Sequence, residues 1–184
     1  MLNLKIYILL SLSVILLLSC KENSNDPGKG GIFETETVAL DKGNARLWVE
    51  LNDEGIPTAY GIKLSESAVL NTTEEISETV IEMPPEGAMT NIKHITIDWN
   101  PHGHEPMQVY GLPHFDFHFY FVGESFRDQI TAVGEDTIKV NKQPEPAYLP
   151  ADYVLTPGGV PRMGAHAVDM TSPEFNGGIF TETF

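Results

Sequence analysis

The sequence predicts an all-β domain, a single antiparallel β-sandwich or barrel with little helix. From residue 32 onward, about ten short runs are rich in β-branched residues or alternate between apolar and polar residues, as strands do. Clusters of Gly, Pro, Asn and Asp lie between these runs and are typical of turns. Many short strands separated by turns favour a sandwich or a barrel.

We expect the strands in the order in which these runs occur. Turn sequences such as Asp41-Lys42-Gly43-Asn44 and Asn52-Asp53-Glu54-Gly55 separate neighbouring strands. Only residues 65–70 favour a turn or two of helix, because Ser65 or Ser67 is a suitable N-cap. The predicted strands are residues 35–40, 45–51, 58–64, 79–83, 92–99, 114–121, 129–133, 137–140, 148–155, 165–170 and 179–184.

The N-terminus has the pattern of a lipoprotein signal peptide. Residues 1–19 begin with a short basic leader and continue in an apolar run, which is too short to favour a permanent membrane span of about 20 residues. Leu17-Leu18-Ser19-Cys20 completes a lipoprotein box, so we expect Cys20 to be lipidated and to anchor the protein to a membrane of the cell envelope, outside the cytoplasmic membrane. The alternative is an uncleaved anchor helix with an incidental cysteine.

The segment after Cys20 is a predicted tether. Residues 20–31 contain almost only polar residues, Gly and Pro, a composition that cannot bury a core. We therefore expect the β domain to comprise residues 32–184.

Charge and motifs exclude several functional classes. The chain has 11 basic and 26 acidic residues and a formal net charge of −15, which repels phosphate backbones and excludes nucleic acid as an expected partner. It contains no Gly-x-Ser-x-Gly elbow and no Gly-rich phosphate loop, and its one cysteine is the predicted lipidation site. The sequence identifies no catalytic residue, substrate or small-molecule ligand.

Residues 114–121 alternate strictly between two kinds of side chain. Because a strand sends alternate side chains to opposite faces, four phenylalanines share one face, which we expect to be a core face. The other face is polar and carries His114, Asp116, His118 and Tyr120.

The polar face of this strand predicts a metal site. His114, Asp116 and His118 lie two residues apart, and His166 from a later strand is the best additional ligand, with Asp169 as its hydrogen-bond partner. Imidazole and carboxylate together suit Zn, Mn, Fe, Ni or Cu. The alternative is that these histidines hydrogen-bond to backbone or carboxylate groups and bind nothing.

A loop bracketed by two prolines carries further candidates. His102, His104 and Glu105 lie between Pro101 and Pro106, where they are additional candidate ligands, although we favour a role in bracing the loop for the two histidines. Before this loop, we expect Trp99 to pack in the core and Asp98 to cap the following turn.

Three motifs resemble a family of secreted and lipid-anchored bacterial proteins whose domain has no known function. They are Asp98-Trp99-Asn100-Pro101-x-Gly103-His104-Glu105-Pro106, Pro113-His114-Phe115-Asp116-Phe117-His118-Phe119-Tyr120 and Val160-Pro161-x-Met163-Gly164-x-His166-x-x-Asp169. This resemblance implies a β-rich subunit that assembles into ring-like homo-oligomers, and it implies no reaction.

A weaker resemblance is to cupins, small barrels that hold a metal with histidines and an acid. It is carried by His114-x-Asp116-x-His118 and by Pro161-x-x-Gly164-x-His166. Three hypotheses follow: a metal-binding, oligomeric lipoprotein; a cupin-like metalloenzyme with an open coordination position beside Tyr120 or Glu105; and a structural or interaction domain whose histidines brace loops.

Overall fold

The computed structural model describes residues 30–181. The predicted signal peptide, Cys20, most of the predicted tether and the last three residues of predicted strand 179–184 lie outside the described residues. Within residues 30–181, no helix has the length and apolar character required to cross a membrane.

The first layer is a four-stranded antiparallel sheet, here called sheet A. Its strands are β1 (Gly31–Glu34), β2 (Val38–Leu40), β3 (Gly43–Leu51) and β4 (Pro57–Leu64), and β3 pairs with all three others. Ala45, Leu47 and Val49 alternate along β3 and are fully buried, so one face of sheet A points into the core.

The second layer is a three-stranded antiparallel sheet, here called sheet B. It consists of β5 (Ser77–Glu82), β6 (His94–Asn100) and β7 (His114–Tyr120), with β6 in the centre. Residues 94–99 of β6 are all buried, although they alternate between polar and apolar side chains. Both faces of sheet B are therefore covered at β6.

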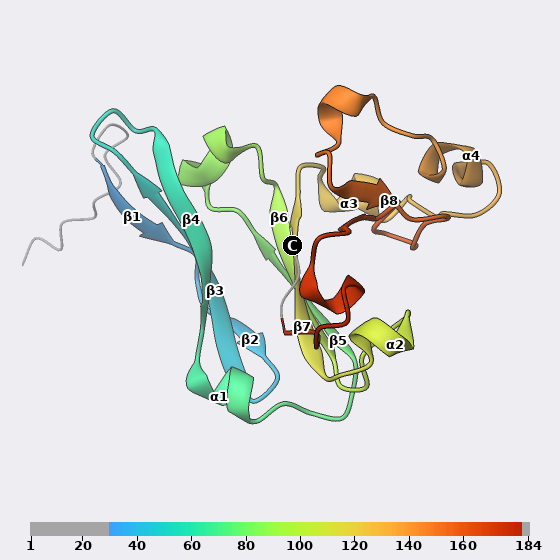
Figure 1. The fold of residues 1–184 in the computed structure, drawn as a ribbon. Helices are drawn as coiled ribbons and strands as arrows, with labels where there is room; N and C mark the ends of the chain where they lie inside the picture. The colour runs from blue at the N-terminus through green and yellow to red at the C-terminus, as the bar shows by residue number, and fades with distance from the viewer. Residues whose placement is uncertain (1–29, 182–184) are drawn as a thin grey trace, which may run out of the picture.

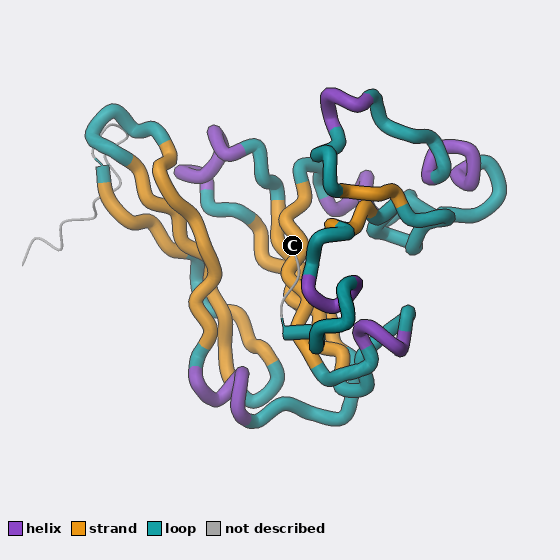
Figure 2. Tube along the Cα trace, viewed as in Figure 1, coloured by secondary structure: helices purple, strands orange, loops and turns teal. Residues whose placement is uncertain are grey.

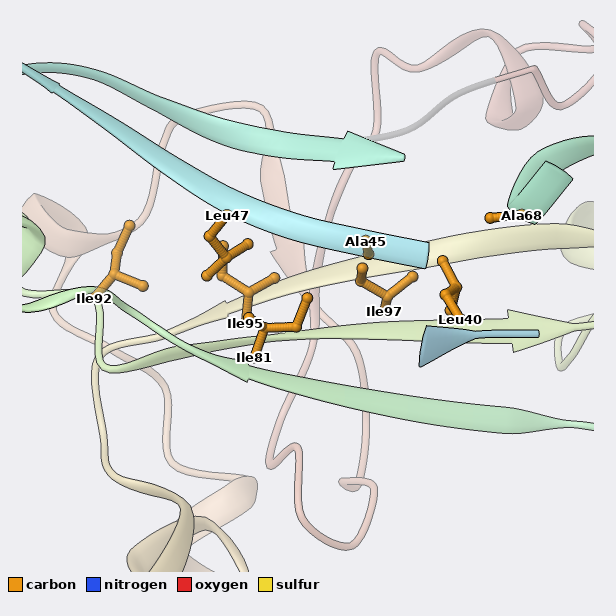
Figure 3. Packing of buried hydrophobic residues seen from close by; sticks show 8 residues of the cluster. All are labelled: Leu40, Ala45, Leu47, Ala68, Ile81, Ile92, Ile95 and Ile97. Atoms are coloured by element: carbon orange, nitrogen blue, oxygen red, sulfur yellow. The ribbon is translucent and has the colours of Figure 1, made fainter. Parts of the chain in front are cut away.

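The core lies between sheets A and B, as Figure 3 shows. Helix α1 (Glu66–Leu70) closes one end of the sandwich, with Ala68 buried and Ser65 Oγ accepting a hydrogen bond from the Ala68 N–H at 3.3 Å. The 3-10 helix η1 (Pro85–Thr90) connects β5 to β6 at the other end (Figure 1). The core residues are Leu40, Ala45, Leu47, Ala68, Ile81, Ile92, Ile95 and Ile97.

The C-terminal part of the chain forms a third layer on the side of sheet B that faces away from sheet A (Figure 1). Most of this layer is loop, as Figure 2 shows. Its short elements are α3 (Glu124–Arg127), α4 (Asp136–Val140), η2 (Pro146–Tyr148), β8 (Tyr153–Leu155), β9 (Ala167–Asp169) and η3 (Pro173–Phe175). Helix α2 (Met107–Tyr110), in the connection between β6 and β7, also belongs to this layer.

The predicted all-β sandwich is confirmed, and the described sheets do not close into a barrel. The helix at residues 65–70 and its Ser65 cap are also confirmed. Two strand predictions are wrong, because residues 129–133 are irregular and residues 137–140 belong to α4. Asp136 explains this local structure, since its carboxylate accepts hydrogen bonds from the backbone N–H and the hydroxyl of Thr131 and so stabilises a turn there.

The boundaries of the other strands differ modestly from the prediction. β8 covers only the end of predicted strand 148–155, and β1 is an additional strand that begins at Gly31, the last residue assigned to the tether. Residues 179–181 form no strand.

The predicted core face of β7 is largely wrong. Phe115 packs against the core, but Phe117 and Phe119 are 41% and 38% exposed and Phe121 is 67% exposed. β7 is an edge strand of sheet B, and among its phenylalanines only Phe115 packs against the core.

Candidate metal centre

The face of sheet B that points away from sheet A is lined with polar side chains. In the register of β6 and β7, Asn100 lies opposite His114, Asp98 opposite Asp116, Thr96 opposite His118 and His94 opposite Tyr120. Directly opposite residues of an antiparallel pair point to the same face, so these eight side chains share one surface beneath the C-terminal layer.

Three of the predicted candidates converge at one end of this face. His114 and Asp116 come from β7, and His104 comes from the loop between β6 and α2. Their ligand atoms all lie within 4.8 Å of one another. His104 Nε2 is 3.3 Å from one oxygen of Asp116, and His114 Nε2 is 3.4 Å from the other. These distances fit a group that can close around one ion.

Backbone carbonyls fix the orientation of both imidazoles. His104 Nδ1 lies 2.9 Å from the carbonyl oxygen of Glu105, and His114 Nδ1 lies 2.6 Å from that of Leu112. Because a carbonyl only accepts, each Nδ1 carries a hydrogen, and each Nε2 faces Asp116, where it is the ring atom available to a metal. Metal-ligating histidines in proteins are held in this way.

Asp116 is oriented by its neighbour on β6. The side-chain amide of Asn100 donates a hydrogen bond of 2.8 Å to Asp116 Oδ2. Both Nε2 atoms thus face the Asp116 carboxylate, and His114 Nε2 is buried without a hydrogen-bond partner among the described residues. A proton or a cation would relieve this arrangement, since a buried acceptor without a partner is costly.

The loop that carries His104 is held by specific contacts. The His104 N–H donates to the Tyr110 carbonyl at 3.0 Å, and the Gly103 N–H donates to the Asn100 carbonyl at 3.2 Å. Gly103 has a φ of +68°, and a Cβ there would lie 2.1 Å from the Tyr110 carbonyl oxygen. Only glycine fits this position, so the sequence of the loop determines where His104 lies.

Aromatic rings enclose one side of the cluster. The ring of Phe180 meets both His114 and Tyr110 edge-on at centroid distances of 5.1 Å. Tyr110 also lies 5.4 Å from His104, and Phe175 lies 6.3 Å from Tyr110. The side chain of His114 is consequently 10% exposed, whereas that of His104 is 42% exposed and leaves the cluster open on its own side.

His118 lies on the same face but has a different partner. Its Nδ1 is 2.8 Å from Asp98 Oδ2, which also accepts a hydrogen bond of 2.8 Å from the hydroxyl of Thr96. Asp98 thus orients His118 and does not cap the turn, contrary to the prediction. Trp99 packs on Phe115 at 4.6 Å and is buried, as predicted.

The other predicted residues lie around the cluster. Burial lowers the pKa of His166, and the charges of His118 and His104 lower it further, so His166 lies in the electrostatic field of this face without belonging to the convergent group. Asp169 accepts hydrogen bonds from Thr171 and does not orient His166. Glu105 accepts from the Met107 N–H, and His102 is exposed.

Sequence reasoning missed a buried ionic cluster at the other end of the face. Arg127 is fully buried, pairs with Glu78 and places its guanidinium 4.6 Å from the centre of the Tyr120 ring. Glu78 also accepts a hydrogen bond of 2.7 Å from Arg162. These contacts attach the C-terminal layer to sheet B.

A histidine and a tyrosine are stacked beside this ionic cluster. The rings of His94 and Tyr120 lie 4.8 Å apart. Burial lowers the pKa of His94, as does the charge of Arg127, and burial raises the pKa of Tyr120. A short Glu-Ser-Phe-Arg segment gives no sequence signal that its arginine is buried.

Comparison with known proteins identifies no relative: no protein-family model, curated protein or solved structure matches this chain.

Proposed function

We propose that this protein is a lipid-anchored domain of the cell envelope that binds one divalent transition metal through His104, His114 and Asp116. The observation that supports it best is the convergence of two Nε2 atoms on one carboxylate, with both Nδ1 atoms held by backbone carbonyls. The signal-peptide pattern and the lipoprotein box at Cys20 support the anchor.

The donor set narrows the choice of metal. Two imidazoles and a carboxylate suit Zn, Mn, Fe, Ni or Cu, whereas calcium and magnesium prefer oxygen ligands alone. Three protein ligands leave at least one coordination position for water or another ligand. The exposed side of His104 is where such a ligand would enter.

Elemental analysis tests the metal. The mature chain beginning at Cys20 is purified, incubated with each of the five metals, desalted and analysed by inductively coupled plasma mass spectrometry. We expect near-stoichiometric retention of at least one metal, and loss of it in His114→Ala and Asp116→Asn. His102→Ala is the matched control, because this exposed histidine lies in the same loop outside the cluster.

A parent protein that retains none of the five metals contradicts the proposal. In that case the histidines serve only as hydrogen-bonding groups of the loop and the sheet, which is the structural alternative.

A metalloenzyme is a second candidate, and the open side of the cluster at His104 favours it. Substitution with Co²⁺ tests for an exchangeable position. If one exists, azide should change the visible absorption of the Co²⁺ protein, and the change should be absent in a site with four fixed protein ligands.

We also propose, from the family resemblance of the three motifs, that the domain forms a homo-oligomer. Sedimentation velocity of the chain without lipid is the direct test, and a monomer at all concentrations would contradict it.

A further inference from the structure

Apolar side chains are exposed together at the end of the sandwich where η1 and the β3–β4 turn lie. Their exposed fractions range from 38% to 67%. Tyr60 and Phe119 are in contact, with ring centroids 5.7 Å apart, and Ile56, Tyr60 and Met89 line one shallow hollow. We call this group the aromatic patch: Ile56, Tyr60, Met89, Phe119 and Phe121.

Phe121, which follows the end of β7, is the fifth residue of the patch. The Lys93 N–H, in the segment between η1 and β6, donates a hydrogen bond of 2.7 Å to the Tyr120 carbonyl, so the backbone at Phe121 lies beside the segment that follows η1. The patch therefore joins β4, η1 and the end of β7. Contiguous exposed apolar surface on a soluble domain typically marks a protein or membrane contact.

The beginning of the described chain lies at the same end of the molecule. Gly31 pairs with Leu51, Leu51 pairs with Pro57, and the Asn52 N–H donates to the Ile56 carbonyl at 2.9 Å. The first strand thus starts beside the turn that carries Ile56, as Figure 1 shows at the tail of β1. An anchor that precedes β1 is therefore connected to the domain at this end.

The length of chain before β1 limits how far this end can be from an anchor. Cys20 and Gly30 are separated by ten residue steps in the sequence, which span at most about 35 Å when fully extended. If Cys20 carries a lipid, as the proposed function states, the end of the domain with the aromatic patch is the one held closest to the bilayer.

The net charge of the protein indicates which lipid headgroups the patch can approach. The net charge of −15 disfavours approach to anionic lipids, and the exposed acids Asp53 and Glu54 lie in the turn just before Ile56. We infer that the aromatic patch rests on the zwitterionic surface of the bilayer to which Cys20 is anchored, so that the domain lies against the membrane in a fixed orientation. Aromatic side chains are well suited to this interfacial region.

Chemical anchoring tests the inference without relying on lipidation in cells. Because Cys20 is the only cysteine, the mature chain can be coupled there to a maleimide lipid in phosphatidylcholine vesicles. The emission that Phe121→Trp adds to that of native Trp48 and Trp99, measured against the coupled parent, reports contact through quenching by brominated phosphatidylcholine. Leu70→Trp is the matched control, since Leu70 is equally exposed but lies in α1 at the opposite end of the sandwich.

We expect loss of the Phe121→Trp emission in brominated vesicles, no loss for Leu70→Trp, and weaker quenching when phosphatidylglycerol is added. Equal emission of Phe121→Trp in brominated and unbrominated vesicles, with coupling verified, overturns the inference. So does a stable dimer of the uncoupled chain that Phe121→Ser dissociates, because a second copy then occupies the patch.

Mass spectrometry of the protein purified from cells tests separately whether Cys20 carries a lipid. A chain with unmodified Cys20 in the envelope fraction contradicts the proposed lipidation, whereas a negative vesicle experiment contradicts only the role of the patch.

Discussion

The two faces of β7 are buried to different degrees, and the difference is opposite to what their composition suggests. The face with Phe117 and Phe119 is more exposed than the face with His114, Asp116 and His118. Sheet A buries the apolar side chains of β6 but leaves Phe117 and Phe119 of β7 partly exposed, while the C-terminal layer covers the polar face. Composition thus shows that a strand has two unlike faces, but the neighbouring layers determine which one is interior.

The largest expected effect is on the polar face, where Arg127 is buried. Arg127→Met should lower the free energy of unfolding by about 3–5 kcal/mol, because it breaks a buried ion pair and leaves Glu78 with one arginine. Arg46→Met is the control, since this partly exposed arginine pairs with Glu34 and should cost about 0–1 kcal/mol. Urea denaturation measures both, and equal small losses would show that the polar face is not a rigid interior.

The apolar face should respond unevenly. Ile97 and Phe117 lie directly opposite each other on this face, but Ile97 is fully buried and Phe117 is not. We expect Ile97→Ala to cost about 2–5 kcal/mol and Phe117→Ala clearly less, although it removes more atoms. A larger loss for Phe117→Ala in urea denaturation would mean that β7 is covered in solution.

Metal binding should stabilise the polar face. At a free metal concentration 100 times the dissociation constant, the free energy of unfolding should rise by about 2.7 kcal/mol in the parent and in His102→Ala. Asp116→Asn should show almost no increase, because the central carboxylate is lost. Thermal denaturation with and without metal measures this, and an equal increase in Asp116→Asn would place the metal elsewhere.

Acid should destabilise the folded protein through His94. The pKa of His94 is lowered from 6.5 in the folded protein by burial and by Arg127, so below about pH 6.5 the unfolded chain binds more protons than the folded chain. The free energy of unfolding therefore falls as the pH decreases through this range. His94→Phe should flatten the pH dependence measured in chelator, whereas replacement of exposed His102 should leave it unchanged. Identical pH profiles for the parent and His94→Phe would exclude this role.

The smallest effect is expected from the ring that covers the metal ligands. Phe180→Ala should speed the release of bound metal to a chelator several-fold, because Phe180 packs against His114. Phe175→Ala is the control, since its ring meets Tyr110 and not His114 in the described ring contacts. Stopped-flow release in a colorimetric chelator compares them, and equal rates would show that the aromatic cover does not limit exchange.

The sequence was most informative where a pattern is local. Alternation predicted the polar face of β7, and the Ser65 cap predicted α1, because both depend on neighbouring residues. The sequence offered His104 only as an additional candidate ligand and favoured a loop-bracing role, since its convergence with His114 depends on the path of the loop around Gly103. The burial of Arg127 depends on contacts with Glu78 and Arg162, which are distant in the chain.

The exposed phenylalanines of β7 also show that sequence alone does not reveal contacts made by distant parts of the chain. An apolar row predicts that something will cover it, but not whether the cover is the same chain. Phe115 packs against the core, whereas Phe121 is 67% exposed among the described residues.

The proposed metal ligands and the groups that orient them all belong to one hairpin. Asn100, His104, the Glu105 and Leu112 carbonyls, His114 and Asp116 lie within seventeen consecutive positions, residues 100–116. A short loop closes at low entropic cost, so bringing these ligands together around an ion costs little even in an unfolded chain. We therefore expect the ion to assemble the β6–β7 hairpin early in folding, and the centre to be portable to other antiparallel sheets as a single contiguous insert.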